Sequence, residues 1–256
     1  MAGRTPAARI ARRWRLACLL WGAAPLAACA SQPPADAPSG DFAAERRRMV
    51  ERQLRGDGIR DRRVLAAMAR VPRHRFVPPE QVPAAYDDTP LPIGFGQTIS
   101  QPYIVAFMTQ AAQVAPGDTV LEIGTGSGYQ AAVLAAMVGP KGAVYTIEIV
   151  PALAARARAT LQALGHANVH VRAGDGYRGW PEHAPFAAVV VTAAPDHVPP
   201  ALVAQLANDA RLVIPVGRER QELLVIDRNA RGVETRRTIP VRFVPFTGEA
   251  TRDSGR

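Results

Sequence analysis

The sequence predicts an α/β fold with a doubly wound, mostly parallel sheet preceded by a helical extension. From residue 119 onward, short runs rich in Val, Ile and Thr alternate with stretches of helical periodicity, which is the pattern of parallel strands joined by crossover helices. The first of these runs ends in a glycine-rich turn that opens a helix, as in nucleotide-binding folds. At 256 residues, with 48% hydrophobic residues, the chain suits one such domain with appendages.

The first 40 residues have the features of a targeting signal followed by a linker. A basic start is followed by an apolar run of about a dozen residues, too short to span a membrane comfortably. Leu26-Ala27-Ala28-Cys29 resembles a bacterial lipobox, so we expect residues 1–29 to be an export signal with a lipid anchor at Cys29, and residues 30–40 to be a flexible linker. Alternatively, translation starts at Met49 and the protein is cytoplasmic rather than periplasmic or lipid-anchored. The mass of the mature chain decides between the two.

The charge balance says little about partners. The formal charge of +9 includes an arginine-rich start, and the later arginine runs are interleaved with acids on expected helices. We read them as solvated helix faces rather than as a nucleic-acid surface. Both cysteines lie in the leader, which excludes a catalytic thiol from residues 41–256, and the five histidines are too scattered in the sequence to indicate a metal site.

Residues 41–256 are expected to form the single folded domain. Two short amphipathic helices come first, one running through Met49 to Leu54 and the other capped by Asp61. A long proline-punctuated stretch follows over 71–101, and its length marks it as functional.

The alternating region begins with a helix that Pro102 opens and that Pro116 and Gly117 end. Strands are predicted at 119–124, 143–149, 168–174, 186–193 and 210–217, helices at 129–138 and 151–165, and two final strands, forming an antiparallel hairpin or edge, at 221–229 and 238–246.

The turn from Gly124 to Gly128 allows a ligand to approach the backbone closely and exposes the N–H groups of the next helix. Its G-x-G-x-G spacing puts Tyr129 where a dinucleotide fingerprint has its last glycine. Glu122, at the end of the preceding strand, is a poor neighbour for a diphosphate and a good partner for an ammonium group. Both features favour a cationic nucleoside without phosphate.

Two further acids complete a pocket. Glu148 ends the second strand roughly twenty residues after the glycine turn, where a carboxylate accepts hydrogen bonds from both ribose hydroxyls. Asp175, after the third strand, is within reach of an adenine amino group. Together these features describe a Rossmann-like pocket for S-adenosyl-L-methionine (SAM). The expected cofactor contacts are Gln97, Thr98, Glu122, Gly124, Thr125, Gly126, Gly128, Glu148, Asp175 and Gly176.

Several blocks occur in order: "PLPIGFGQTISQPYIVAFMTQ", "VLEIGTGSGYQAAVLA", "GDGYRGWPEHAPFAAVVVTAAPDHVP", "RLVIPVG" and "VRFVPFTG". They closely resemble the protein-L-isoaspartate O-methyltransferase family, while the leader lies outside the family's usual pattern. The resemblance implies a seven-stranded SAM-dependent methyltransferase sheet. It also implies methylation of the free α-carboxylate of L-isoaspartyl residues in damaged proteins, with D-aspartyl residues as a further expected substrate, and this methylation initiates repair.

By the same resemblance, Ser100 in "TISQP" matches the family's active-site serine, and residues 241–245 match the segment that lines the peptide site. A carboxylate is already ionised at neutral pH and needs no general base. The loop around Ser100 is therefore expected to act as a polar clamp that aligns donor and acceptor. The expected substrate contacts are Ile99, Ser100, Thr192, Arg242, Phe243 and Val244.

The expected partners are isoaspartyl-containing proteins and peptides, with no nucleic acid, and the expected state is a monomer. Two alternatives stay open. One is a SAM-dependent enzyme acting on RNA or a small molecule, although "TAAPD" stands where many RNA base methylases place an Asn/Asp-Pro-Pro-aromatic turn. The other is an inactive lipid-anchored relative, against which Ser100, Glu148 and Asp175 argue. An exported copy would need its SAM delivered, because SAM is made in the cytoplasm.

Overall fold

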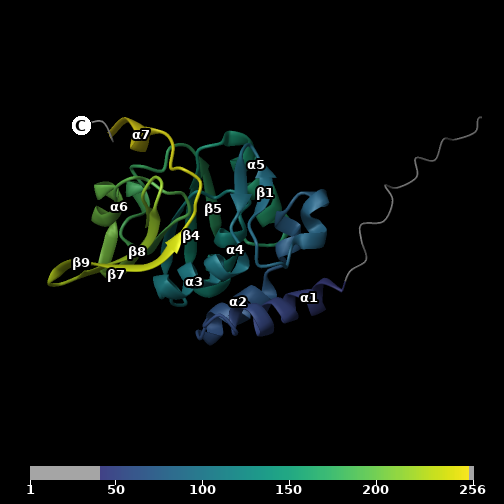
Figure 1. Cartoon of the computed structure of the whole chain (residues 1–256). Helices are drawn as coiled ribbons and strands as arrows, with labels where there is room; N and C mark the ends of the chain where they lie inside the picture. The colour runs from purple at the N-terminus through teal and green to yellow at the C-terminus, as the bar shows by residue number, and fades with distance from the viewer. Residues whose placement is uncertain (1–40, 254–256) are drawn as a thin grey trace, which may run out of the picture. The chain divides into compact units, whose positions relative to one another are not determined.

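The computed structural model describes residues 41–253, and the predicted leader and linker lie outside these residues. A seven-stranded sheet has the order β5-β4-β3-β6-β7-β8-β9 (Figure 1). Neighbouring strands from β5 to β7 are parallel, and β8 and β9 complete the sheet as antiparallel strands. The predicted doubly wound, mostly parallel sheet is confirmed. Its strands are β3 (Thr119–Ile123), β4 (Ala143–Glu148), β5 (Val169–Ala173), β6 (Phe186–Val191), β7 (Leu206–Val216), β8 (Gln221–Asn229) and β9 (Gly232–Val241).

The helices follow the predicted order. They are α1 (Phe42–Arg48), continued by the π-helical turns η1 (Met49–Leu54), then α2 (Arg62–Arg70), α3 (Pro102–Ala112), α4 (Tyr129–Val138), α5 (Pro151–Ala163), α6 (Pro200–Ala204) and α7 (Glu249–Asp253). Asp61 caps α2 as predicted, because its side chain accepts hydrogen bonds from the backbone N–H groups of Arg63 and Val64. None of the helices between residues 41 and 253 is long and apolar enough to cross a bilayer.

The central parallel strands β3 and β6 are buried on both faces, since successive side chains point to opposite sides of the sheet. On β3, Val120 packs into a cluster with α3, α4 and α5, whereas Leu121 and Ile123 pack into a second cluster with α6 and α7. Helix α4 is buried nearly all round, and α2 and α3 contact it. The N-terminal helices are therefore part of the core of the domain.

Four boundaries differ from the prediction. The stretch over 71–101 is not a plain loop: it contains the 3-10 turns η2 (Arg73–Phe76) and η3 (Pro79–Ala84) and the hairpin of β1 (Leu91–Gly94) and β2 (Gln97–Ile99). Helix α3 ends before Pro116 because Gln113 adopts a left-handed φ of 52°. Strand β7 begins earlier than predicted, at Leu206, and β9 lies earlier, at 232–241.

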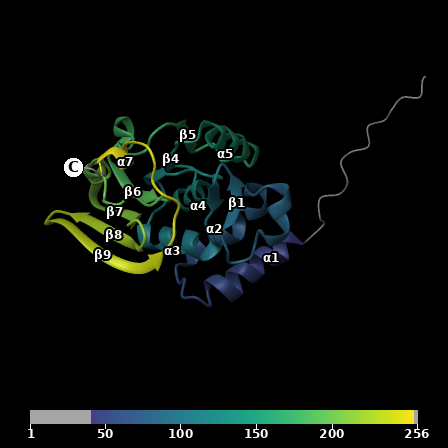
Figure 2. The same ribbon diagram turned by 45° about the horizontal axis from the view of Figure 1, so that its top comes forward.

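The chain that leaves β9 does not continue as a strand. In both views it runs across the domain to α7 (Figure 1 and Figure 2). It makes one bridge on the way, in which Ala194 lies beside Pro245. We call residues 244–250 the C-terminal strap.

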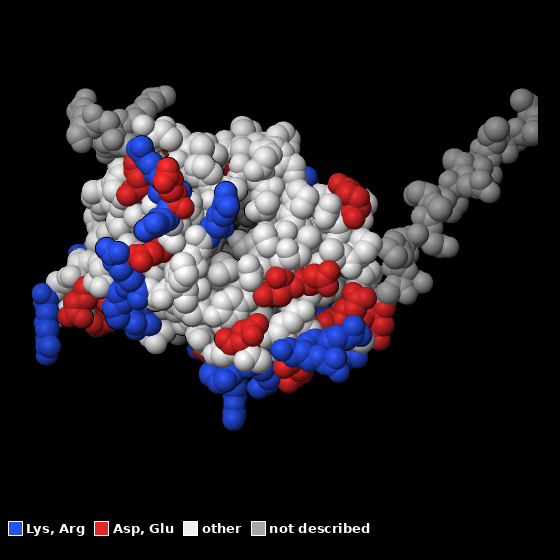
Figure 3. Space-filling model, viewed as in Figure 1, with Lys and Arg blue, Asp and Glu red and all other residues white. Residues whose placement is uncertain are grey.

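Charged side chains of both signs lie over α1 and α2. On the face shown in Figure 3, arginines and carboxylates are interspersed along these helices. Arg55 and Glu51 form an exposed ion pair one turn apart. Such pairs stabilise a fold only weakly, so this surface is solvated rather than structural.

The sheet contains one fully buried acid. Glu122 on β3 accepts a hydrogen bond from Thr146, its register partner on β4, and its other carboxylate oxygen has no hydrogen-bond partner among the described residues. Burial, reinforced by the charge of Glu148 and opposed by the Thr146 hydrogen bond, raises the pKa of Glu122 to about 8. The Glu122 carboxyl is therefore mostly protonated at neutral pH.

We expect Glu122→Gln to become more stable relative to the wild type as the pH rises from about 5 to about 8. Over that range the unfolded carboxyl is ionised while the folded one retains its proton, so the wild type loses stability with rising pH. Glutamine stays neutral and avoids this loss. Urea unfolding of both proteins at several pH values measures the difference, and a gap that did not widen with pH would contradict the assignment.

Candidate active site

The site lies at the carboxyl ends of β3 and its neighbours β4 and β6, where crossovers leave the sheet in opposite directions and a crevice forms. Thr192, just after β6, donates its hydroxyl to the Gly124 carbonyl at 2.6 Å, with the Ile123 carbonyl at 3.1 Å. Gly124 has a φ of +95°, and a Cβ there would lie 2.4 Å from the Thr192 hydroxyl oxygen. Glycine is therefore required here both by conformation and by space.

One cavity lies between the glycine turn and the C-terminal strap. We call it the nucleoside cavity; its volume is about 90 Å³. Glu148 is the only charged residue among the described residues that line it. The lining residues are Gln97, Thr98, Ile123, Gly124, Gly126, Ile147, Glu148, Ile149, Val150, Gly176, Thr192, Ala193, Val244, Pro245, Phe246 and Thr247.

The chemistry of this lining fits a cationic nucleoside. The Glu148 carboxylate accepts one backbone N–H on each oxygen, from Gly126 at 2.7 Å and from Val150 at 2.9 Å. Each carboxylate oxygen has a second lone pair, so acceptor capacity for two ribose hydroxyls remains. Ile149 is 40% exposed in the cavity wall and offers an apolar surface to a base. Without a lining cation, the cavity is unsuited to a diphosphate.

Six of the ten predicted cofactor contacts line this cavity, namely Gln97, Thr98, Gly124, Gly126, Glu148 and Gly176. The other four lie behind it. Glu122 is buried in the sheet, so the structure does not place it beside an ammonium group, contrary to the prediction. The Thr125 hydroxyl lies 2.6 Å from that of Thr146 and thereby ties the glycine turn to the hydrogen bond of Glu122. Gly128, with a φ of +90°, is the N-cap of α4.

Asp175 also differs from its predicted role. Its carboxylate accepts the backbone N–H of Tyr177 at 2.9 Å and that of Glu249 at 2.7 Å. Asp175 therefore ties the loop after β5 to the first residue of α7 and is not in the cavity wall, whereas its neighbour Gly176 is. The loop after β5 thus reaches the cavity through Gly176, while the Asp175 side chain points to the strap.

A second cavity, of about 670 Å³, adjoins the first, and we call it the acceptor cavity. Arg242 is the only charged residue among its described lining, which consists of Pro90, Thr98, Ser100, Gln101, Tyr103, Ile104, Thr192, Ile239, Pro240, Val241, Arg242, Phe243 and Val244. Five of the six predicted substrate contacts belong to it. The exception is Ile99, which is 4% exposed and packs in the core; its alternation with Thr98 and Ser100 turns it inward.

The two cavities meet at three residues that line both, Thr98, Thr192 and Val244. Ser100 lines the acceptor cavity and a small adjoining pocket beside Gly124 and Gly126, but not the nucleoside cavity. An atom bound at the junction is therefore within reach of groups from β2, from the turn after β6 and from the strap.

Sequence reasoning missed Asp88, which holds the loop of Ser100. Its carboxylate accepts the Tyr103 backbone N–H at 2.8 Å and the Gln101 side-chain amide at 3.0 Å. It thus caps α3, whose own N-cap residue Gln101 makes no side-chain cap. A cap supplied from so far along the chain leaves no local signal in the sequence. Ile149 was missed too, although an apolar residue directly after Glu148 was a usable signal.

Gly124→Ala is expected to destabilise the protein more than Gly117→Ala. Both glycines have nearly the same φ, +95° and +92°, but a Cβ at Gly117 meets nothing within 4 Å. Left-handed backbone costs an alanine about 1–2 kcal/mol at either site, and the clash with Thr192 adds about 1–3 kcal/mol at Gly124 alone. Urea unfolding measures both. Thr192→Ala should reduce the difference between them, and equal costs would show that the contact does not constrain the turn.

Comparison with known proteins identifies the group to which the chain belongs. The family model for protein-L-isoaspartate(D-aspartate) O-methyltransferase matches residues 44–251. A protein-L-isoaspartate O-methyltransferase of Gloeobacter violaceus is 59% identical over 207 residues, covering 80% of this chain and 100% of that protein. A second enzyme of that name, from an Anaeromyxobacter species, is 53% identical over 233 residues, covering 90% of this chain and 95% of its own.

Solved structures show the same relationship. One protein-L-isoaspartate O-methyltransferase superposes with a TM-score of 0.74 at 29% identity, covering 80% of this chain and 67% of its own. Another, from Plasmodium falciparum and in complex with S-adenosyl-L-homocysteine, has a TM-score of 0.70 at 26% identity and covers 79% of this chain and 98% of its own. The family model, the identity of the relatives and the shared fold agree, and the chain belongs to the protein-L-isoaspartate O-methyltransferase family.

Proposed function

We propose that the protein transfers the methyl group of SAM to the free α-carboxylate of L-isoaspartyl residues, and also to the side-chain carboxylate of D-aspartyl residues, in damaged proteins and so initiates their repair. The observation that carries this proposal is the pair of adjoining cavities with opposite single charges. The nucleoside cavity has one lining anion, Glu148, and the acceptor cavity one lining cation, Arg242. A cationic donor and an anionic acceptor are each attracted to their own side of the junction. Membership of the family supports the assignment of both ligands.

The residues of the chain hold and align the two partners. Glu148 and the glycine turn would hold the nucleoside, and SAM, when bound, supplies an electrophilic methyl group on a sulfonium. The acceptor carboxylate is already ionised, so no side chain has to remove a proton. Ser100 donates a hydrogen bond that orients the carboxylate, Arg242 attracts it, and Thr98 and Thr192 enclose the junction. Alignment of reacting atoms in this way lowers the barrier by several kcal/mol or more.

We also propose that the protein is active as a monomer, as expected from the sequence. The leader is proposed to direct export and to carry a lipid on Cys29, both outside the described residues. Sedimentation of the purified protein and the mass of its mature N-terminus test these two points.

The full-length protein is expected to transfer label from SAM to an isoaspartyl peptide and not to the same peptide with a normal aspartate. In the isoaspartyl peptide the free carboxylate of that residue is the α-carboxylate, because the chain continues through the side chain, whereas a normal L-aspartate offers only its side-chain carboxylate. Labelled methyl incorporation measures both. Equal labelling of the two peptides, or labelling of RNA instead of either, would overturn the proposal.

Ser100→Ala is expected to lower kcat about tenfold, the cost of one hydrogen bond to a charged acceptor, while leaving the Kd of SAM near the wild-type value. The reason is that Ser100 lines the acceptor cavity but not the nucleoside cavity. Thr160→Ala on α5 loses a hydroxyl outside both cavities and serves as the matched control. An unchanged kcat would remove Ser100 from this role, and a weaker SAM complex would move it to the other cavity.

A further inference from the structure

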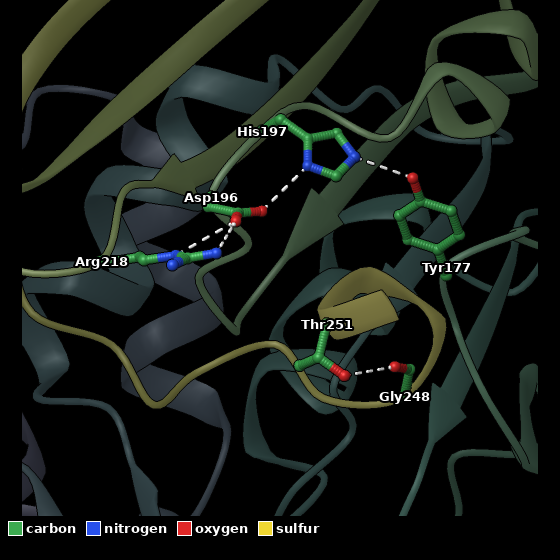
Figure 4. A network of polar contacts seen from close by, with 6 residues as sticks. All are labelled: Tyr177, Asp196, His197, Arg218, Gly248 and Thr251. Atoms are coloured by element: carbon green, nitrogen blue, oxygen red, sulfur yellow. Dashed lines mark hydrogen bonds and ion pairs between the residues drawn. The ribbon is translucent and has the colours of Figure 1, made fainter. Parts of the chain in front are cut away.

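Three loops at the cavity edge of the sheet are joined by one chain of polar side chains (Figure 4). Arg218, after β7, donates to one oxygen of Asp196 at 2.7 Å. The other oxygen of Asp196 lies 2.9 Å from Nδ1 of His197, and Nε2 of His197 lies 2.8 Å from the Tyr177 hydroxyl. Since a carboxylate only accepts, neutral His197 carries its proton on Nδ1, and Nε2 accepts from Tyr177.

Tyr177 is the member of this chain that contacts the wall of the nucleoside cavity, although it does not itself line the cavity. It is 8% exposed, and its backbone N–H donates to Asp175, next to the lining residue Gly176. Its ring stands edge-on to that of Phe246, with centroids 6.4 Å apart and planes 83° apart. Phe246 belongs to the strap and also lines the cavity. Tyr177 therefore contacts both the loop and the strap that bound the cavity on this side.

The strap forms one wall of the cavity. Backbone hydrogen bonds hold it to Ala194, from Ala194 to Val244 and from Phe246 to Ala194, each at 2.9 Å, and the Glu249 N–H donates to Asp175. The volume of about 90 Å³ is below the roughly 300–1,000 Å³ of a usual ligand site. The position of the strap therefore sets how much room a nucleoside has in this cavity.

We propose that Asp196, His197 and Tyr177 are positioning residues that hold the strap and the Asp175–Gly176 loop in this arrangement and thereby set the affinity for the cofactor. The inference rests on the proposed function, because it takes the nucleoside cavity to be the cofactor site. The hydrogen bond from the Tyr177 hydroxyl to His197 holds the Tyr177 ring edge-on to Phe246. Without this hydrogen bond the ring is held less firmly against Phe246, and this arrangement of the cavity wall is populated less.

A purely structural role would have a different signature. The Arg218 side chain is 70% exposed and that of His197 36% exposed, so their contacts contribute little to global stability. The chain of hydrogen bonds from Arg218 to Tyr177, which we call the relay, lines neither cavity. Its last member Tyr177 packs against Phe246 in the wall of the nucleoside cavity, whereas none of its members has a ring contact with a residue of the acceptor cavity. Its loss should therefore weaken cofactor binding selectively.

The test uses the full-length protein and the variants Tyr177→Phe, His197→Ala and the double variant. Calorimetry gives the Kd of S-adenosyl-L-homocysteine, and steady-state kinetics give separate KM values for SAM and for an isoaspartyl peptide. We expect each single variant to raise the Kd and the KM of SAM about tenfold, the effect of one hydrogen bond, while the KM of the peptide changes less than about twofold. The double variant should be no weaker than the single ones, because both break the same relay.

Two further variants sharpen the test. His197→Gln offers an acceptor close to the place of Nε2 and should restore part of the affinity lost in His197→Ala. Asp227→Asn removes a carboxylate on β8 that forms ion pairs with Arg211 and Arg236. Asp227 lines neither cavity, so this variant should leave the Kd of S-adenosyl-L-homocysteine and both KM values unchanged.

Three outcomes would overturn the inference: a wild-type Kd in Tyr177→Phe, an equal rise in the two KM values, or additive losses in the double variant. If the wild type methylates the isoaspartyl peptide and the variants bind S-adenosyl-L-homocysteine as tightly as the wild type, the role of Asp196, His197 and Tyr177 is refuted and the proposed function stands. A wild-type protein that binds no S-adenosyl-L-homocysteine would refute the proposed function and the relay with it.

Discussion

The hydrogen bond from the Thr192 hydroxyl to the Gly124 carbonyl sets the geometry on which both cavities depend. It joins the end of β6 to the turn after β3, the two adjacent strands from which the crossovers diverge. Because the hydroxyl occupies the space of a Cβ on Gly124, the turn and the Thr192 loop touch without an intervening side chain. A methyl donor in the nucleoside cavity and a methyl acceptor in the acceptor cavity would thus be separated only by small groups.

Glu122 and Glu148, on the neighbouring strands β3 and β4, have opposite electrostatic roles. Glu122 is fully buried, and its raised pKa keeps it neutral, so it adds no charge behind the glycine turn. Glu148 lies at the cavity wall with two backbone N–H donors, and it contributes the only lining charge there. The neutral acid connects Thr146 and Thr125 to the turn from within the sheet, while the charged one faces the ligand. Environment, and not residue type, separates a structural acid from a binding one.

The sequence predicted what depends on local pattern and missed what depends on distant contacts. Runs of β-branched residues located the parallel strands, and Asp61 and Pro102 located helix starts, because these signals act within a few residues. The segment 242–246 was predicted as strand from its apolar residues. Its side chains instead pack against loops across the sheet edge, a contact that no periodicity reveals.

The candidate site divides in the same way. The glycine turn and Glu148 could be placed from their spacing at strand ends, and Ser100 from the resemblance. Asp175 and Glu122 have the right residue type at the right strand end, yet their partners, Glu249 and Thr146, are remote in sequence and redirect both side chains. The Asp88 cap and the Tyr177–His197 contact are invisible for the same reason.

The strap reaches the cavities because an even number of strands, β8 and β9, follows β7. Strand β7 runs parallel to β6, β8 reverses that direction and β9 reverses it again, so the chain emerges from β9 at the edge where β3 and β6 also end. An odd number of added strands would deliver the chain terminus to the opposite edge, with the full height of the sheet between it and the reaction. Strands beyond β7 can therefore be added or lost only in pairs if the strap is to stay beside the cavities. The β8–β9 hairpin is in this sense a single unit of the fold.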